Sequence, residues 1–266
     1  MKNSNVVWWG GEEDYLPWNW GDQLNPWLFS KISGVPYDDV KKVYLEEKED
    51  IPRYYCIGSI LNHVESEGAE VWGSGFEYAH LGINIKPTKI HAVRGPLTRK
   101  GLIEKGIDCP EIYGDPALLM PKYYTPKVKK KYKYGIIQHF LHQNETAWLS
   151  KYENDPRVNI IDITNPSITG FVDEINKCEM IFSSALHGII CADAYGIPSY
   201  HVNFDREGKY NWFKFNDYYA SVGRPIVSPA LLLSKDIDIE EIWPPPYNYY
   251  IDIDLDKLYE ACPFKK

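Results

Sequence analysis

Residues 179–199 constrain the fold more than any other part of the chain. The run at residues 179–182 (Glu-Met-Ile-Phe) is short and apolar, as a buried strand of a parallel sheet is. Ser183 and Ser184 are suited to cap a helix, and Gly196 is suited to end it. The pattern therefore predicts a strand, a tight turn and a helix in immediate succession.

His187 lies in the first turn of that predicted helix, just beyond the carboxyl end of the strand. Ligands bind at this position in open α/β sheets, and a helix N-terminus favours anions. The helix dipole also disfavours a protonated imidazole, so we expect His187 to be neutral near pH 7 and to act as a base or donate from one nitrogen. The alternative is a buried histidine satisfied by a backbone carbonyl.

The same alternation of strands and helices recurs along the chain and predicts doubly wound parallel sheets. Strands are predicted at 5–9, 54–58, 69–73, 89–94, 134–139, 158–163, 179–182 and 198–202, and helices at 22–33, 96–105, 145–152, 170–177 and 254–262. A break rich in proline and lysine at 121–133 separates two series. We predict domains at 1–122 and 123–246, with a segment at 247–266 that packs back on the first domain.

Composition excludes several classes of function. The net charge of −8, with one lysine-rich run at 127–133, argues against a nucleic-acid partner. That run is interpreted as a solvated linker, and peripheral contact with an anionic membrane is the less favoured alternative. The first residues show no apolar leader and no stretch is long enough to span a membrane, so we expect a cytoplasmic protein, with the inner membrane face as the alternative.

Cysteine and histidine spacing gives no sign of a metal. The five cysteines are scattered with no CxxC pair, and no HxxxH pair occurs, so we expect free thiols and no metal or cofactor. Aromatic residues make up 15% of the chain, which suits either a carbohydrate site or a packed core.

Polar residues and glycines follow several predicted strands. Asp22 is either the N-cap of the first helix or a ligand contact. The turns at 58–61 and 73–76 allow a ligand close to the backbone and can donate N–H groups to an anion. Arg94 can grip a carboxylate or phosphate, or form a salt bridge with a helix residue. Asp115 is expected to bond backbone amides in its own turn.

Two further cations follow the last predicted strand of the second series. Arg206 and Lys209 are candidates for a second anionic group of a ligand, and solvated charges are the alternative. The chain has neither a phosphate-binding P-loop nor a dinucleotide Gly-x-Gly-x-x-Gly after its first strand.

Five short motifs together resemble the polysaccharide pyruvyltransferase family. They are Asn-Trp-Gly-Asp at 19–22, Gly-Ser-Gly at 73–75, Val-Arg-Gly-Pro-Leu-Thr at 93–98, Gly-Asp-Pro-Ala at 114–117 and Ser-Ala-Leu-His-Gly at 184–188. The resemblance covers about residues 5–205. It implies a glycosyltransferase-B-like fold of two Rossmann-like domains facing across a cleft. It also implies phosphoenolpyruvate as donor and a sugar diol, on a polysaccharide or its lipid-linked precursor, as acceptor.

The resemblance also implies roles for individual residues. The histidine of the Leu-His-Gly motif and the arginine of the Arg-Gly-Pro motif match His187 and Arg94, and the aspartate of the Trp-Gly-Asp motif matches Asp22. We expect His187 to handle a proton at the donor, Arg94 to hold its phosphate or carboxylate, and Asp22 to orient or deprotonate an acceptor hydroxyl. The other expected donor contacts are Leu186, Ser74, Gly75, Arg206 and Lys209, and the expected acceptor contacts are Trp20, Phe76 and Asn19.

Two other functions remain open at the level of sequence. One is a nucleotide-sugar glycosyltransferase of the same fold, which requires a site for a nucleotide diphosphate. The other is a non-catalytic binding protein that kept the fold, because fold alone does not decide function.

Overall fold

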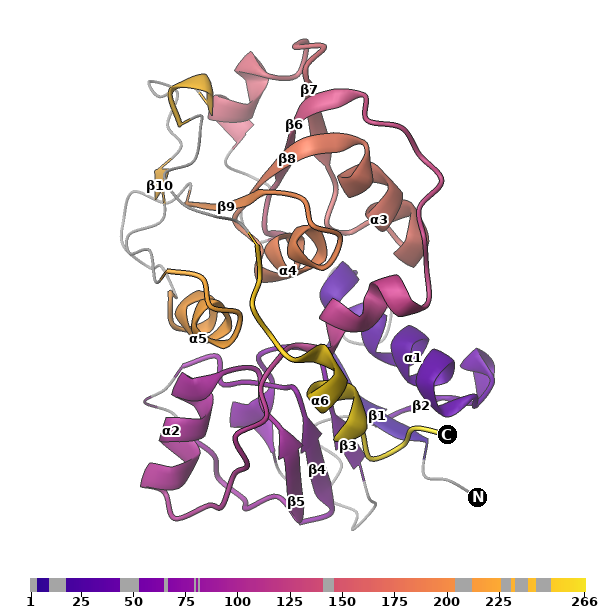
Figure 1. Ribbon diagram of the computed structural model, residues 1–266, viewed down its shortest axis with the longest axis vertical. Coiled ribbons are helices and arrows are strands. Elements are labelled where there is room, and N and C mark those ends of the chain that lie inside the picture. The colour runs from indigo at the N-terminus through magenta and orange to yellow at the C-terminus, as the bar shows by residue number, and fades with distance from the viewer. Residues whose placement is uncertain are drawn as a thin grey trace.

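The strands form two separate parallel sheets. The computed structural model describes residues 4–9, 18–43, 53–64, 67–78, 80, 82–140, 146–203, 212–225, 231–232, 239–242 and 250–266. In these ranges one sheet has the order β2-β1-β3-β4-β5 and the other the order β10-β9-β8-β6-β7. Every strand pairing recorded in them is parallel, which confirms the predicted sheet type. Figure 1 shows the first sheet below and the second above.

The strands are short, and all those described except β2 and β10 overlap the predicted ranges. The first sheet contains β1 (Asn5–Val7), β2 (Lys41–Lys42), β3 (Arg53–Tyr55), β4 (Ala69–Trp72) and β5 (Lys89–Ala92). The second contains β6 (Tyr132–Ile137), β7 (Val158–Ile161), β8 (Cys178–Ser183), β9 (Ser199–Asn203) and β10 (Leu231–Leu232).

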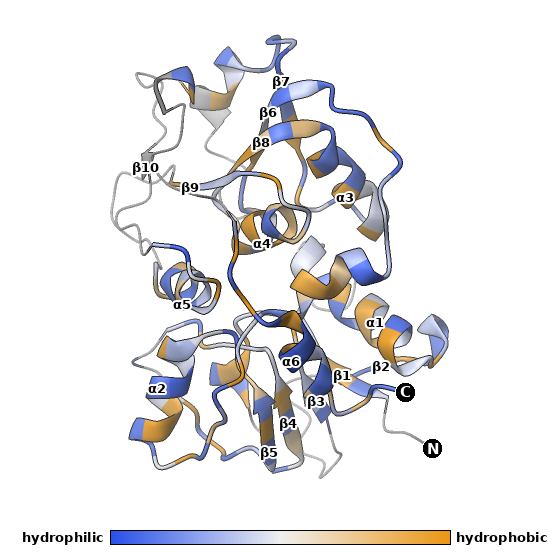
Figure 2. Cartoon of the chain, viewed as in Figure 1, coloured by the Kyte–Doolittle hydropathy of each residue, from blue (hydrophilic) through white to orange (hydrophobic). Residues whose placement is uncertain are grey.

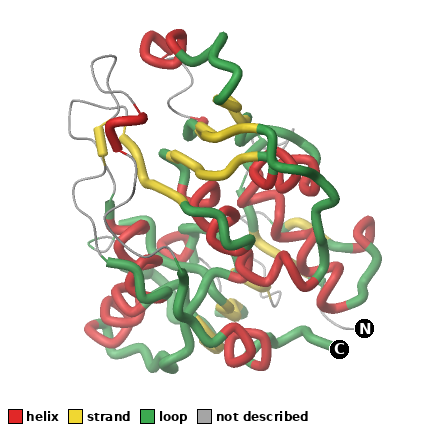
Figure 3. Tube along the Cα trace, turned by 45° about the horizontal axis from the view of Figure 1, so that its top comes forward, coloured by secondary structure: helices red, strands yellow, loops and turns green. Residues whose placement is uncertain are grey.

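Helices connect the strands and cover the sheets. The α-helices are α1 (Trp20–Ser33), α2 (Pro96–Glu104), α3 (Ile168–Asn176), α4 (Leu186–Ala194), α5 (Phe213–Ser221) and α6 (Leu255–Glu260). Short 3-10 helices are η2 (Tyr37–Asp39), η3 (Leu61–His63), η4 (Pro116–Lys122), η6 (Thr146–Lys151) and η7 (Ile239–Ile242). The helix predicted at 145–152 is the 3-10 helix η6. Both the tube view and the ribbon place helices between the two groups of strands (Figure 3).

The largest of three hydrophobic clusters among the described residues extends through both halves of the chain. It joins buried residues of α1 and η4 to those of β6, α3 and α4. The indole N–H of Trp20 in α1 donates to the carbonyl of Ile168 in α3 at 2.9 Å, and the Trp20 ring packs on Phe171 with the ring centroids 4.9 Å apart. Figure 2 shows apolar colouring on α1 and α4 as well as on β4 and β5. The two sheets are therefore held by shared apolar packing around α1.

The last helix returns to the first sheet. The indole N–H of Trp72 in β4 donates to the carbonyl of Leu258 in α6 at 2.9 Å. Phe264 packs on Phe29 and Tyr54, with centroid separations of 4.4 and 5.0 Å. Figure 1 shows this yellow segment beside the strands of the first sheet.

The five cysteines are buried and unpaired, as the spacing predicted. Among the described residues, none of the helices combines the length and apolarity that a membrane crossing requires.

Candidate functional site

His187 occupies the first turn of α4, where β8 ends. The N-cap of α4 is Ala185, and no side chain caps the helix, so the predicted capping by Ser183 and Ser184 is wrong. The hydroxyl of Ser183 instead accepts from the Ala185 N–H at 3.0 Å, and that of Ser184 accepts from the His139 N–H at 2.8 Å. The serines thus fix the turn and leave the first turn of α4 without a side-chain cap.

The imidazole of His187 lies directly against the backbone of α1. A Cβ atom at Gly21 would stand 1.9 Å from Nδ1 of His187, so only glycine permits this approach. The His187 side chain is 11% exposed. The contact places Asp22, the residue after Gly21, beside the histidine of the other half of the chain.

Asp22 lies in the first turn of α1 but is not its N-cap. Asn19 has that role, because its side-chain oxygen accepts from the Gly21 N–H at 3.2 Å. Asn19, which we predicted as an acceptor contact, therefore uses its amide oxygen to cap α1. Within the described part of the chain, the Asp22 carboxylate has no hydrogen-bond partner and remains available to a ligand.

The electrostatic surroundings of Asp22 are unusual for a carboxylate. Burial is the main cause that raises the pKa of Asp22 to about 6, and the carboxylate of Asp115 adds to it. The neighbouring His187, Lys214 and Lys42 oppose the rise. Asp22 can therefore change its charge close to neutral pH, as a proton-transfer group must.

Asp115 lies on the other side of His187, at the N-terminus of η4. Its Oδ1 accepts from the Ala117 N–H at 2.9 Å, which confirms the predicted bond to the backbone of its turn. Its Oδ2 lies 3.6 Å from Nε2 of His187. The Asp115 side chain is fully buried.

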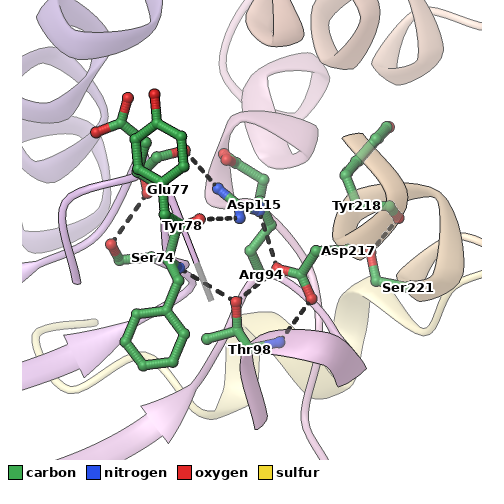
Figure 4. Close-up of polar contacts among 12 residues, drawn as sticks. Ser74, Glu77, Tyr78, Arg94, Thr98, Asp115, Asp217, Tyr218 and Ser221 are labelled. Carbon is green, nitrogen blue, oxygen red and sulfur yellow. Dashed lines mark hydrogen bonds and ion pairs between the residues drawn. The ribbon is translucent and has the colours of Figure 1, made fainter. Parts of the chain in front are cut away.

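Arg94 is fully buried and its guanidinium bonds to the protein itself. Nε donates to the Asp217 carboxylate at 3.1 Å, and the two terminal nitrogens donate to the Ser59 hydroxyl and the Phe76 carbonyl, each at 2.7 Å. Figure 4 shows Arg94 between Asp217 and the segment around Ser74 and Glu77. Of the two interpretations of Arg94, the structure shows the salt bridge with a helix residue. The direct grip on a ligand remains a prediction.

The glycine-serine turn at 73–76 supports Arg94. A Cβ atom at Gly75 would stand 2.5 Å from Cζ of Arg94, so the turn closes on the guanidinium. The Ser74 hydroxyl and the Gly75 N–H both donate to the Gly58 carbonyl, at 3.0 and 3.1 Å. These two donors, predicted to contact the ligand, therefore join the two glycine turns to each other. Leu186, another predicted donor contact, is only 4% exposed at the start of α4.

The aromatic residues predicted to stack on a sugar do not have the required exposure. Trp20 and Phe76 are both 0% exposed. Trp20 packs between the halves of the molecule, and Phe76 lies beneath Gly101 of α2. Because no ring face is accessible, we correct this prediction: both rings belong to the core.

Sequence reasoning missed Lys214 and Asp217 of α5. Lys214 is half-buried, and its ammonium has no hydrogen bond or ion pair with the part of the chain that the structure describes. Burial lowers the pKa of Lys214 and so does Arg94, whereas Glu77 and Asp22 oppose this. Their sequence context is an ordinary helix, and only the packing of α5 brings them to Arg94 and Asp22. Arg206 and Lys209 lie outside the described residues.

A family comparison now decides the class of protein. A model of the polysaccharide pyruvyl transferase family matches residues 71–206, just over half of the chain. The chain belongs to this family. The matched range contains Arg94, Asp115 and His187, whereas Asp22 and Lys214 lie outside it.

Two curated proteins resemble the chain at similar levels. The uncharacterized protein L143 of Acanthamoeba polyphaga mimivirus is 30% identical over 209 residues, covering 77% of this chain and 71% of the viral protein. The succinoglycan biosynthesis protein ExoV of Rhizobium meliloti (strain 1021) is 29% identical over 220 residues. That match covers 77% of this chain and 62% of ExoV.

Proposed function

We propose that the protein transfers a pyruvyl group from phosphoenolpyruvate to two hydroxyls of a sugar in polysaccharide biosynthesis and forms a cyclic ketal. The observation that carries this proposal is the meeting of His187 and Asp22 at the uncapped N-terminus of α4, in a chain of the pyruvyl transferase family. A donor with a carboxylate and a phosphate suits a helix N-terminus with a lysine nearby.

The net reaction relocates two hydroxyl protons and cleaves one carbon–oxygen bond. A proton added to the methylene carbon of phosphoenolpyruvate makes the methyl group and leaves an oxocarbenium-like centre at the neighbouring carbon. One sugar hydroxyl adds there, the carbon–oxygen bond to phosphate breaks, and the second hydroxyl closes the ring. Of the two hydroxyl protons, one balances the proton on the methyl group and the other leaves with inorganic phosphate.

Each polar residue of the site has a role in this scheme. His187 delivers the proton to the methylene carbon, and Asp22 accepts the proton of the attacking hydroxyl when it is ionised. Lys214 and the first turn of α4 hold the anionic groups of the donor. Arg94 has an indirect role. Its bond to Asp217 holds α5 in place, and α5 carries Lys214.

We further propose that residues 1–122 and 123–246 form two Rossmann-like domains that face each other across the donor site, in the manner of glycosyltransferase-B enzymes. Support comes from the chain order at the site: Asp22 follows β1 of the first sheet, and His187 follows β8 of the second. The acceptor, free polysaccharide or its lipid-linked precursor, lies on the side of Asp22 in this proposal.

Calorimetry with phosphoenolpyruvate tests the donor. We expect saturable binding to the wild type and binding weakened by about tenfold or more in Lys214→Met, since one charge-assisted contact is removed. Lys151→Met, a change at an exposed lysine of η6, is the matched control and should bind as the wild type does. Binding of nucleotide diphosphates instead of phosphoenolpyruvate would support the glycosyltransferase alternative. Donor binding without phosphate release in the presence of any sugar acceptor would support a binding protein.

A further inference from the structure

We propose that Asp115 is the positioning residue of His187: its carboxylate fixes which ring nitrogen carries the proton and leaves the other nitrogen for the substrate. The effect on turnover rests on the proposed function, whereas the pairing of the two side chains does not.

Two buried polar atoms without hydrogen-bond partners in the described part of the chain lie next to each other. Oδ2 of Asp115 and Nε2 of His187 are enclosed by the protein, and neither has a hydrogen-bond partner among the described residues. They lie 3.6 Å apart. Buried polar atoms without partners are rare because their desolvation is not compensated. Two such atoms of opposite character facing each other indicate a contact that forms when the site is occupied.

The distance is slightly longer than a hydrogen bond, and this is common before a substrate binds. Catalytic hydrogen bonds are often long in the free enzyme and tighten in the complex. The two residues come from different halves of the chain, η4 and α4, which pack against each other. A small approach of these elements brings the two atoms into hydrogen-bond distance.

The two oxygens of Asp115 have separate tasks. Oδ1 accepts from the Ala117 N–H and so fixes the side chain at the N-terminus of η4. Oδ2 is thereby held toward His187. As an acceptor-only group, an ionised carboxylate requires a proton on Nε2, and Nδ1 is then the nitrogen that takes up and delivers the proton at the donor.

Nδ1 lies against Gly21, next to Asp22. The arrangement therefore presents Nδ1 of His187 toward the side of the site where Asp22 lies. A carboxylate, an imidazole and a second carboxylate follow one another across the site, with different tasks: Asp115 orients, His187 moves the proton at the donor, and Asp22 serves the acceptor.

The test is the tautomer of His187, measured by ¹⁵N NMR chemical shifts of the full-length protein without substrate. We expect the Nε2–H form in the wild type. Asp115→Asn keeps the oxygen that caps η4 but turns an N–H₂ group toward Nε2, so we expect the Nδ1–H form in this variant. An Nδ1–H tautomer in the wild type overturns the proposal, and that measurement needs no variant. An unchanged tautomer in Asp115→Asn overturns it as well.

A second experiment measures kcat and KM from the rate at which phosphate is released from phosphoenolpyruvate in the presence of an acceptor. Asp115→Asn should lower kcat by about 10²- to 10⁴-fold, the range seen when a histidine is held in the wrong tautomer or loses an orienting partner. KM for the donor should change less than about threefold, because binding groups are untouched. Unchanged kcat overturns the positioning role.

Asp254→Asn is the matched control. Asp254 caps α6 through the Lys257 N–H at 2.8 Å, as Asp115 caps η4, but its side chain is exposed and has no hydrogen bond or ion pair with His187. It should retain wild-type kcat and the wild-type tautomer. If the wild type shows the expected tautomer but no pyruvyl transfer with any acceptor, the proposed function fails and the pairing of Asp115 with His187 stands.

Discussion

At Asp22 the protein keeps a carboxylate largely out of water between charged neighbours. Its pKa is about 6 in the folded protein, against 3.8 for an ordinary aspartate. The folded state therefore binds more protons than the unfolded state between these values. The stability associated with protonated Asp22 is fully present below pH 3.8 and is lost as the pH rises through about 6. The residue thus lowers the stability of the protein at the pH where we propose that it works.

Replacing Asp22 by asparagine should stabilise the protein above pH 6. We expect Asp22→Asn to raise the melting temperature at pH 8 by about 2–4 °C, equivalent to about 1 kcal/mol, because no charge is buried. At pH 4, where wild-type Asp22 is largely protonated, the gain should vanish. Thermal unfolding followed by circular dichroism at both pH values measures this. Asp256→Asn, at a side chain that is 88% exposed, should change neither value.

The same pKa predicts the shape of the activity profile. If Asp22 accepts the proton of the acceptor hydroxyl, kcat/KM should rise with pH through about 6, as the carboxylate ionises. In Asp22→Asn this rise should be absent and the remaining activity low. Initial rates between pH 4.5 and 8.5 distinguish the cases. A wild-type profile that is flat through pH 6 would exclude Asp22 as the base.

Adding a single methyl group at Gly21 should displace the imidazole of His187 and so disturb the site. Gly21→Ala forces a methyl group into the imidazole of His187, and we expect at least about a hundredfold loss of kcat, since misplacement by about 1 Å has such effects. Gly196→Ala places a methyl group where no other atom lies within 4 Å, although its φ of +66° makes the change mildly destabilising. It should lower stability without lowering the kcat of the folded protein.

Among the elements, α5 joins the two halves through polar contacts. Asp217 accepts from the backbone N–H of Thr98 at 2.9 Å and pairs with Arg94, so it fixes α2. The neighbouring Tyr218 donates to Asp193 of α4 at 2.9 Å, and Asp193 pairs with Arg224 at 2.8 Å. One short helix thus makes buried charged contacts with both sides of the site.

Removing one partner of the Arg94–Asp217 pair should destabilise the protein strongly. We expect Asp217→Ala to lower the free energy of unfolding by about 3–5 kcal/mol, because Arg94 is left as an uncompensated buried charge. The double variant with Arg94→Ala should lose much less than the sum of the two single losses. Urea unfolding of the four proteins gives the coupling energy. Additive losses would show that the pair contributes no more than its separate side chains.

At the scale of the whole molecule, the C-terminal segment packs on the first sheet. Phe264 is 2% exposed and packs in an aromatic cluster with Phe29, Tyr54 and Trp72. We expect Phe264→Ala to lower the free energy of unfolding by about 3 kcal/mol, as other large-to-small changes in cores do. The kcat per folded molecule should be retained, since the ring partners of Phe264 are residues of the core and not of the candidate site. Tyr250→Ala, at an 83% exposed side chain, is the control.

How far the sequence could predict this structure depended on the range of the interactions. Local patterns were sufficient for most of the strands, for the parallel sheets and for the start of α2 at Pro96, but not for β2 and β10. They could also place His187 beyond β8. The burial of Trp20 and Phe76 could not be predicted from the sequence. An aromatic residue near the end of a strand has the same local pattern whether it packs in a core or stacks on a sugar. Arg94 meets Asp217 across 123 residues, and no local spacing encodes that pair.

The return of the chain to its first sheet has a consequence for synthesis in the cell. Trp72 and Phe29 are made long before Leu258 and Phe264, their packing partners. At a translation rate of about 5–20 residues per second, roughly 10–40 s separate Trp72 from Phe264. During that time the growing chain carries an aromatic surface with no cover, which is a substrate for chaperones. Translation speed and chaperone supply should therefore affect the yield of this protein.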